Sequence, residues 1–285
     1  FIHGNWALDN SHPHGFGCGV NNELIVLREE GCYVDYTFPA SPDPCQTSTI
    51  NKIYYAKDDP ERCKSHDTGM RVKAGGKPWG DLMLIQGPLG FKWNDRKFGI
   101  IPRIENSDIR TSCPPTPDRV DAWIETGIHV EGKPEWIFVK IHTHGTQERD
   151  MDTLLGEPMR RCYEHLHAKY NDGREWKLHH VSAREMYNIV KAAEQGLDVL
   201  GLTDHDTFDG LREAKLAAEG TDLTVLPGLE MSCQLDGASV HLLGYGCDPH
   251  DESLLNELTR VRVGRTGRLP EMLAKLAELG MPLTE

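Results

Sequence analysis

The spacing of apolar residues changes near residue 196 of this 285-residue chain, and this change limits what the chain can fold into. Beyond that point, short apolar runs alternate regularly with helical patterns. The alternation predicts strands at 197–203, 223–227 and 239–245, and helices at 209–219 and within 252–280. A regular succession of strands and helices is typical of a parallel sheet or a β/α barrel.

The chain up to about residue 192 has a different pattern. It is rich in Gly, Pro, Trp and His, and turn-forming residues separate its apolar runs. The pattern predicts buried strands at 82–85, 99–101 and 136–141, and helices at 21–30, 158–170 and 182–195. Ser182 and Glu185 form a capping-box sequence at the start of the last helix, and Gly196 is expected to end that helix.

Composition argues against several classes of protein. Acidic residues outnumber basic ones by 44 to 31, and the resulting net charge of -13 disfavours extended binding to nucleic-acid phosphates. A small site for nucleotides stays open. No apolar run is long enough for a membrane helix, so no membrane partner is expected. The absence of a signal-peptide pattern and of any C-x-x-C pair favours a cytoplasmic protein with free thiols. The oligomeric state is left open.

Ligand-type side chains follow three successive predicted strands of the C-terminal part. Asp204 and His205 come directly after the first strand, Glu230 follows the second, and His241 lies at the start of the third. In parallel α/β folds, chemistry gathers at the carboxyl ends of the strands. A lone His is more often a core residue, but three such residues in order favour a divalent metal as their partner.

The residues that carry these groups resemble the polymerase and histidinol phosphatase (PHP) family, in the segments 196–207, 227–230, 241–245 and 262–280. The resemblance implies a distorted β/α barrel with two or three divalent metals, of Zn, Mn or Fe type. It implies metal-dependent hydrolysis of nucleotides or other small phosphate esters. It also implies that His205, Glu230 and His241 are metal ligands, that Glu230 bridges two ions, and that Asp204 lies in or beside the metal site.

The sequence departs from the pattern of that family in three places. The His-x-His that precedes the strand is replaced by adjacent His179 and His180, the Ser-Asp-Gly loop after it is missing, and the closing Asp-x-His is absent. Because the chain starts without Met and ends in a run typical of another element's start, we expect a fragment. A catalytically inactive fragment that binds at most one metal is therefore an alternative. Arginines 260, 262, 265 and 268 fit either phosphate contact or a solvated helix face.

A second group of ligand-type residues follows the predicted strand at 136–141. His142 and His144 are separated by one residue, so an extended backbone directs both rings to one face. This arrangement suits metal binding or acid–base chemistry. The alternatives are a pair of His in a surface loop, and a displaced PHP motif with residues 146–195 as an insertion.

The N-terminal part resembles polysaccharide deacetylase-like proteins, in the segments 4–10, 20–24, 35–39 and 182–190. The resemblance implies a β/α barrel with one zinc held by an Asp and two His, and removal of acetyl groups from sugars. It implies that His142 or His144 is the acid that protonates the leaving group. His3, His12 and His14 lie close together in the sequence, where a turn is expected.

The segment 191–196 fits both families. The sequence therefore predicts an α/β protein made of two incomplete β/α-barrel modules: a deacetylase-like region at 1–192 and a PHP-like region at 193–285. A closed barrel with strands from both regions would contradict this hypothesis. The expected function is metal-dependent hydrolysis by the PHP-like region, with sugar deacetylation by the first region as the alternative.

Overall fold

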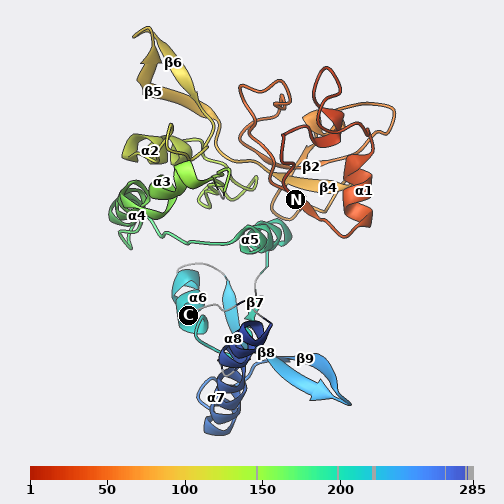
Figure 1. Cartoon of the computed structure of the whole chain (residues 1–285), viewed down its shortest axis with the longest axis vertical. Helices are drawn as coiled ribbons and strands as arrows, with labels where there is room; N and C mark the ends of the chain where they lie inside the picture. The colour runs from red at the N-terminus through yellow and green to blue at the C-terminus, as the bar shows by residue number, and fades with distance from the viewer. Residues whose placement is uncertain (146, 198, 220–222, 267, 280, 282–285) are drawn as a thin grey trace. The chain divides into compact units, whose positions relative to one another are not determined.

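The computed structural model describes the whole chain except residues 146, 198, 220–222, 267, 280 and 282–285. It forms two compact units, Phe1–Gly196 and Leu197–Glu285 (Figure 1). Each unit combines helices with sheets, so the predicted α/β class is confirmed. Among the described strands no sheet combines the two units and none closes into a barrel. None of the described helices is long and apolar enough to cross a membrane.

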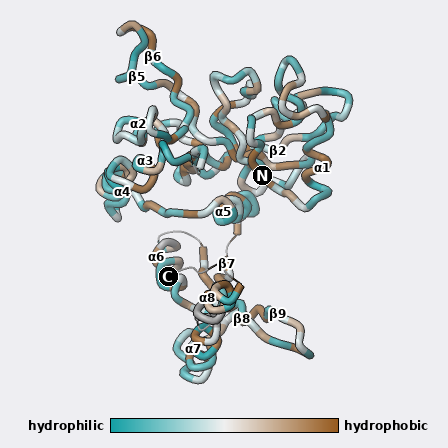
Figure 2. Tube along the Cα trace, viewed as in Figure 1, coloured by the Kyte–Doolittle hydropathy of each residue, from teal (hydrophilic) through white to brown (hydrophobic). Residues whose placement is uncertain are grey.

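The first unit is built on a four-stranded sheet. Its strands lie in the order β1 (Val34–Asp35), β4 (Leu82–Ile85), β2 (Ile53–Ala56) and β3 (Met70–Arg71). β1 is parallel to β4, whereas β2 is antiparallel to both β4 and β3. All residues of β2 and β4 are buried. Figure 2 colours hydrophobic residues brown, and the tube is brown around the label of β2.

The two central strands bury both faces, because successive side chains in a strand point to opposite sides. Ile53, Tyr55, Met83 and Ile85 pack with Met186 and Val190 of helix α5 (Ala183–Gln195). The alternate residues of the two strands point to the other face and pack with Leu24 of helix α1 (Glu23–Glu29); they are Tyr54, Ala56, Leu82 and Leu84. A sheet covered by helices on both faces needs continuously apolar strands, which explains the run at 82–85.

Helix α5 has the predicted capping box. The Ser182 side chain accepts from the backbone N–H of Glu185, and the Glu185 carboxylate accepts from the N–H of Ser182 at 2.6 Å. Gly196 follows in the left-handed conformation at φ 61° and ends the helix.

The rest of the first unit surrounds a separate core. Helices α2 (Pro117–Glu125) and α4 (Glu157–Tyr170) contribute Val120, Trp123, Cys162 and Tyr170 to it. The remaining elements here are the hairpin β5 (Gly90–Lys97) and β6 (Ile101–Glu105), helix α3 (Met151–Leu155), and the 3-10 turns η1 (Leu8–Asn10), η2 (Ser65–Asp67) and η3 (Glu148–Asp150).

Two predicted strands of this unit are wrong. Residues 99–101 lie in and just after the β5–β6 turn, where Gly99 has φ 72° and Ile100 is exposed. Residues 136–141 form no ladder, although Phe138 N–H bonds to the Ile128 carbonyl. Periodicity alone cannot identify a strand in apolar runs as short as these, because neither the burial of the side chains nor a partner strand follows from the run itself.

The second unit contains a three-stranded sheet in the order β7 (Val199–Leu202), β8 (Thr224–Leu235) and β9 (Ala238–Tyr245). β7 and β8 are parallel, and β8 and β9 are antiparallel. The strand predicted at 223–227 continues to Leu235, because the Asp236-Gly237 turn folds it into a hairpin with β9. Helices α6 (Leu211–Ala218), α7 (Glu252–Thr266) and α8 (Arg268–Glu278) complete the unit.

Candidate metal centre in the second unit

The structure brings His205, Glu230 and His241 together. Each offers one ligand atom, and the three atoms lie within 4.8 Å of one another. Nε2 of His205 is 3.6 Å from Oε1 of Glu230, and Nδ1 of His241 is 2.7 Å from the same oxygen. The two imidazole rings have centroids 4.5 Å apart and are almost perpendicular.

Backbone pairing fixes this arrangement. The chain beyond β7 stays beside β8, because the Glu230 N–H bonds to the Asp204 carbonyl and the Asp206 N–H bonds to the Glu230 carbonyl, each at 3.0 Å. His205 therefore forms a parallel bridge with Glu230. On the other side of β8, Glu230 pairs with Leu243 of β9, two residues from His241. Residues two apart share a face, so His241 and Glu230 lie on the same face of the sheet.

Asp206 is the residue that holds His205 in place. It is fully buried and adopts φ 57°, a left-handed conformation that Asp tolerates better than most residues. Oδ2 of Asp206 lies 3.1 Å from Nδ1 of His205 and accepts from the Ser232 hydroxyl at 2.9 Å. Oδ1 of Asp206 accepts from the backbone N–H of Ser232 at 2.7 Å. A proton on Nδ1 leaves Nε2, the atom that faces Glu230, with its lone pair.

These side chains fit a divalent cation. Two imidazole nitrogens and one carboxylate form a donor set that zinc, manganese and iron accept. The carboxylate of Asp206 on the far nitrogen of His205 is the outer partner that metal-binding His residues usually have. The side chains of the three ligand-type residues are 30 to 48% exposed, so the group is open to solvent on one side.

Asp204, predicted in or beside the metal site, is not one of the three grouped residues. Gly210, the N-cap residue of α6, has no Cβ, and a Cβ placed there would lie only 2.4 Å from Oδ2 of Asp204. The Asp204 side chain is therefore packed against the start of α6. Asp206 and Ser232, by contrast, were not among the predicted site residues. The signal for Asp206 was its place in the Asp-His-Asp run, whereas Ser232 had no local signal.

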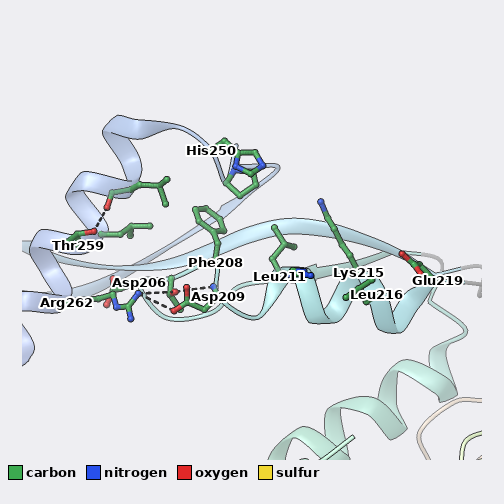
Figure 3. A pocket seen from close by; sticks show the side chains of 15 residues that line it. Asp206, Phe208, Asp209, Leu211, Lys215, Leu216, Glu219, His250, Thr259 and Arg262 are labelled. Atoms are coloured by element: carbon green, nitrogen blue, oxygen red, sulfur yellow. Dashed lines mark hydrogen bonds and ion pairs between the residues drawn. The ribbon is translucent and has the colours of Figure 1, made fainter. Parts of the chain in front are cut away.

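A cavity of about 540 Å³ adjoins this group through Asp206. It lies between the 206–219 segment and helix α7, and its lining includes the cationic residues Arg212, Lys215 and Arg262 (Figure 3). His205, Glu230 and His241 do not line it. Nη1 of Arg262 lies 3.2 Å from Asp209 and 3.3 Å from the Thr207 hydroxyl, which ties α7 to the loop after His205.

The other arginines of the predicted basic patch differ in their surroundings. Arg260 pairs with Glu257 on the exposed face of α7, as expected for a solvated helix surface. The side chains of Arg265 and Arg268 lie outside the described residues.

The structure places His142 and His144 in the first unit. His142 forms a parallel bridge with Asp108, and its Nδ1 is buried with no partner in the part of the chain that the structure describes. Burial first, and then nearby cationic groups, lower the pKa of His142 to about 3. The ring is therefore neutral at pH 7, without the proton that an acid must give. His144 packs edge-on against Trp6 with centroids 5.6 Å apart.

Neither of these two histidines joins a group of three ligand-type side chains among the described residues. The adjacent His179 and His180 also remain outside such a group; Nε2 of His180 instead lies 3.1 Å from Nε2 of His167.

Comparisons with known proteins relate part of the chain to two curated proteins and one solved structure. No family model matches the chain. The chain is 34% identical over 117 residues to a 3′,5′-nucleoside bisphosphate phosphatase of Chromobacterium violaceum, covering 41% of this chain and 38% of that protein. It is 30% identical over 118 residues to a 5′-3′ exoribonuclease of Haemophilus influenzae, covering 41% and 40%. The chain thus spans about two fifths of the length of these relatives.

A solved structure of an amidohydrolase from Chromobacterium violaceum with bound sulfate is 37% identical over 33% of this chain and 34% of that chain. Its TM-score is 0.30, which carries no information on the fold. The names of the two curated relatives both describe enzymes that hydrolyse phosphate esters.

Proposed function

We propose that the second unit is part of a metal-dependent phosphoesterase of PHP type, acting on nucleotides or other small phosphate esters. The observation that carries the proposal is the convergence of His205, Glu230 and His241 from three neighbouring backbone segments. The names of the two curated relatives support the substrate class. The proposal concerns the PHP-like region predicted at 193–285, of which the second unit holds residues 197–285, and it treats the sheet of this unit as part of a β/α barrel.

Each residue of the group has a distinct task in this proposal. His205, Glu230 and His241 would hold a divalent cation, which supplies Lewis-acid stabilisation of the phosphoryl oxygens and lowers the pKa of water. Asp206 keeps His205 in the tautomer whose Nε2 faces Glu230. Ser232 in turn holds Asp206 through two hydrogen bonds. Asp204, packed on Gly210, shapes the loop rather than holding the ion.

The cavity beside Asp206 is proposed to receive the substrate. Arg212, Lys215 and Arg262 line it, and guanidinium and ammonium groups are the side chains that bind phosphate best. Acidic side chains line it too, among them Asp209, which already pairs with Arg262. A phosphate ester that enters would exchange this internal pair for its own contacts with Arg262.

The deacetylase-like function stays a prediction for residues 1–192. Such an enzyme needs one Asp and two His around a zinc ion, and the described residues contain no such group near His142 or His144. We therefore propose no deacetylase chemistry for this region.

The test measures metal content and phosphate release with the full chain. A nucleoside 3′,5′-bisphosphate serves as substrate with added Mn²⁺. We expect Glu230→Gln to lower kcat/KM at least about 100-fold. Loss of a residue that only hydrogen-bonds to a metal ligand already lowers metal affinity or activity about 10- to 100-fold, and Glu230 would be a ligand itself. Glu257→Gln, the same chemical change on the exposed face of α7, is the matched control and should retain activity.

Three outcomes are distinguishable. Metal-dependent hydrolysis that Glu230→Gln abolishes supports the proposal. Hydrolysis that survives Glu230→Gln contradicts it. Bound metal without hydrolysis of any phosphate ester tested identifies the inactive fragment instead, and also contradicts the proposed function.

A further inference from the structure

A second group of metal-ligating side chains lies in the first unit. His3, Cys18 and Glu23 each offer one ligand atom, and the three atoms lie within 4.8 Å of one another. They come from three separate segments: the start of the chain, a Gly-rich loop, and the first residue of α1. The group shares no residue with the one in the second unit.

The distances suit a tetrahedral ion. Sγ of Cys18 is 3.3 Å from Oε2 of Glu23, and Nε2 of His3 is 3.6 Å from Oε1 of Glu23. Zinc binds sulfur, nitrogen and oxygen at about 2.0–2.3 Å, so neighbouring ligand atoms of a tetrahedral site are separated by roughly 3.3–3.8 Å. Each separation falls in this range, Cys18 at one oxygen of Glu23 and His3 at the other; with one ligand atom from each residue, the three atoms lie within 4.8 Å of one another.

Contacts from outside the group hold the backbone of His3 and the carboxylate of Glu23. The backbone N–H of His3 donates to the Thr37 hydroxyl at 2.8 Å, and the Thr37 hydroxyl donates to buried Asp35. Oε2 of Glu23 accepts from the Asp9 N–H at 2.7 Å, which orients the carboxylate. An outer hydrogen bond of this kind is typical of carboxylates that bind metals.

The loop that carries Cys18 is shaped by glycine. Gly17 and Gly19 have φ values of 88° and 122°, which side chains rarely allow. A Cβ at Gly17 would lie 2.4 Å from the Asn5 side-chain nitrogen, and that nitrogen donates to the Gly17 carbonyl at 3.0 Å. Close approach of Asn5 therefore requires Gly17, and it fixes the backbone beside the Cys18 thiol.

Burial favours an ion in this place. The side chains of His3 and Glu23 are only 11% and 15% exposed. A carboxylate that is shielded from water loses hydration, and a divalent cation offsets that loss. The Cys18 thiol donates to Glu23 in the structure, and a cation bound by both side chains would take the place of this proton. A thiolate with an imidazole disfavours Mg²⁺ and Ca²⁺, which prefer oxygen ligands, and favours Zn²⁺.

We propose that His3, Cys18 and Glu23 form a zinc site in the first unit. Three protein ligands leave the fourth tetrahedral position for water or a small anionic ligand. The ion also links the chain start, the Gly-rich loop and α1. Leu24, next to Glu23, belongs to the core on the α1 face of the sheet. Zinc therefore stabilises the first unit by mass action.

Co²⁺ is the probe for this site, because a tetrahedral Co²⁺ with a thiolate ligand gives a near-ultraviolet charge-transfer band. The full chain is used with His241→Ala, which disables the group in the second unit. We expect one equivalent of Co²⁺ to produce the band and Zn²⁺ to bleach it. Cys18→Ser should abolish the band, whereas Cys63→Ser, at an exposed cysteine, should retain it.

Glu23→Gln gives an independent readout. It keeps the thiol and the approximate shape of the side chain, so we expect the band to remain but the affinity for Co²⁺ to fall by at least about tenfold. Far-ultraviolet circular dichroism establishes that each variant is folded. The proposal is overturned if the full chain with His241→Ala gives no thiolate band. It is also overturned if the band persists in Cys18→Ser or is lost equally in Cys63→Ser. None of these results depends on phosphatase activity.

Discussion

Oε1 of Glu230 lies 2.7 Å from Nδ1 of His241, although these two residues do not face each other in the β8–β9 register. Glu230 pairs with Leu243, and His241 pairs with Ser232. The offset of two residues keeps both side chains on one face of the sheet, whereas a slip of one residue would separate them. The candidate metal centre therefore depends on the register that the turn at Asp236 and Gly237 sets.

Asp206→Asn tests whether this carboxylate positions His205. The amide keeps the size of the side chain but replaces one acceptor oxygen with a donor, so it cannot keep all three hydrogen bonds that Asp206 accepts from His205 and from the N–H and hydroxyl of Ser232. We expect affinity for Mn²⁺ to fall by about 10- to 100-fold in titration calorimetry. Asp152→Asn, at an exposed residue of α3, is the matched control. Unchanged affinity in Asp206→Asn would mean that His205 needs no support from this residue.

Glu105→Gln tests the buried ion pair of the first unit. Glu105 accepts from Nε and Nη2 of Arg119 at 2.7 and 2.8 Å, and both side chains are buried. We expect the free energy of unfolding at pH 7 to fall by about 3–5 kcal/mol, because Arg119 loses its partner. All six tryptophans lie in the first 196 residues, so denaturant unfolding followed by Trp fluorescence reports this unit. Glu125→Gln on the exposed end of α2 should change little.

The same pair predicts a pH dependence. Burial alone would raise the pKa of Glu105, but the hydrogen bonds and charge of Arg119 outweigh it, so the pKa lies below the usual 4.5. A depressed carboxyl pKa contributes stability that is complete above the unfolded pKa and is lost as the pH falls through the folded pKa. The stability gap between wild type and Glu105→Gln should therefore shrink below pH 4.5. A gap that stays constant there would rule out this ion pair as the cause.

Lys140→Met is expected to stabilise the first unit. Nζ of Lys140 is buried and has no hydrogen-bond partner among the described side chains and backbone. Burial lowers the pKa of Lys140 from 10.5 to about 8, a shift worth about 3 kcal/mol of destabilisation at pH 7. Met fills a similar volume without a charge. Urea unfolding followed by Trp fluorescence should show a higher midpoint, and Lys57→Met, at an exposed residue, should not.

The sign of the pH effect separates this cause from better packing. Between the folded pKa of about 8 and the unfolded value of 10.5, the unfolded state binds more protons. The wild-type protein should therefore gain stability as the pH rises through this interval, and its deficit relative to Lys140→Met should shrink. A deficit that is independent of pH would assign the effect to packing alone.

Ser182→Ala tests the capping box of α5. The change removes the acceptor for the Glu185 N–H at the start of a helix that supplies Met186 and Val190 to the core. We expect the free energy of unfolding of the first unit to fall by about 1 kcal/mol in the Trp fluorescence assay. Ser112→Ala, at an exposed loop residue, provides the comparison. Equal effects of the two changes would show that the cap is not important for stability.

Local patterns in the sequence predicted elements best where packing follows periodicity. The helix at 182–195 carried its own start and stop signals, and the structure has it at Ala183–Gln195. The run at 82–85 became β4 because a strand buried on both faces needs apolar residues throughout. The run at 136–141 carried the same signal but forms a loop in which, of the apolar residues, Phe138 alone is buried and Ile141 is exposed, because no described strand pairs with it along its length.

The sequence by itself determined which ligand-type residues stand beside the apolar runs of the second unit, and so Asp204, His205, Glu230 and His241 could be named. Their place relative to the strand ends was not predicted, because Glu230 and His241 lie inside the hairpin of β8 and β9. Only the tertiary structure decided which of these side chains meet. Strand register joined His241 to Glu230, a left-handed turn aimed Asp206 at His205, and packing on Gly210 separated Asp204 from them. His3, Cys18 and Glu23 also met through loop conformation, because such contacts depend on backbone geometry that no local pattern encodes.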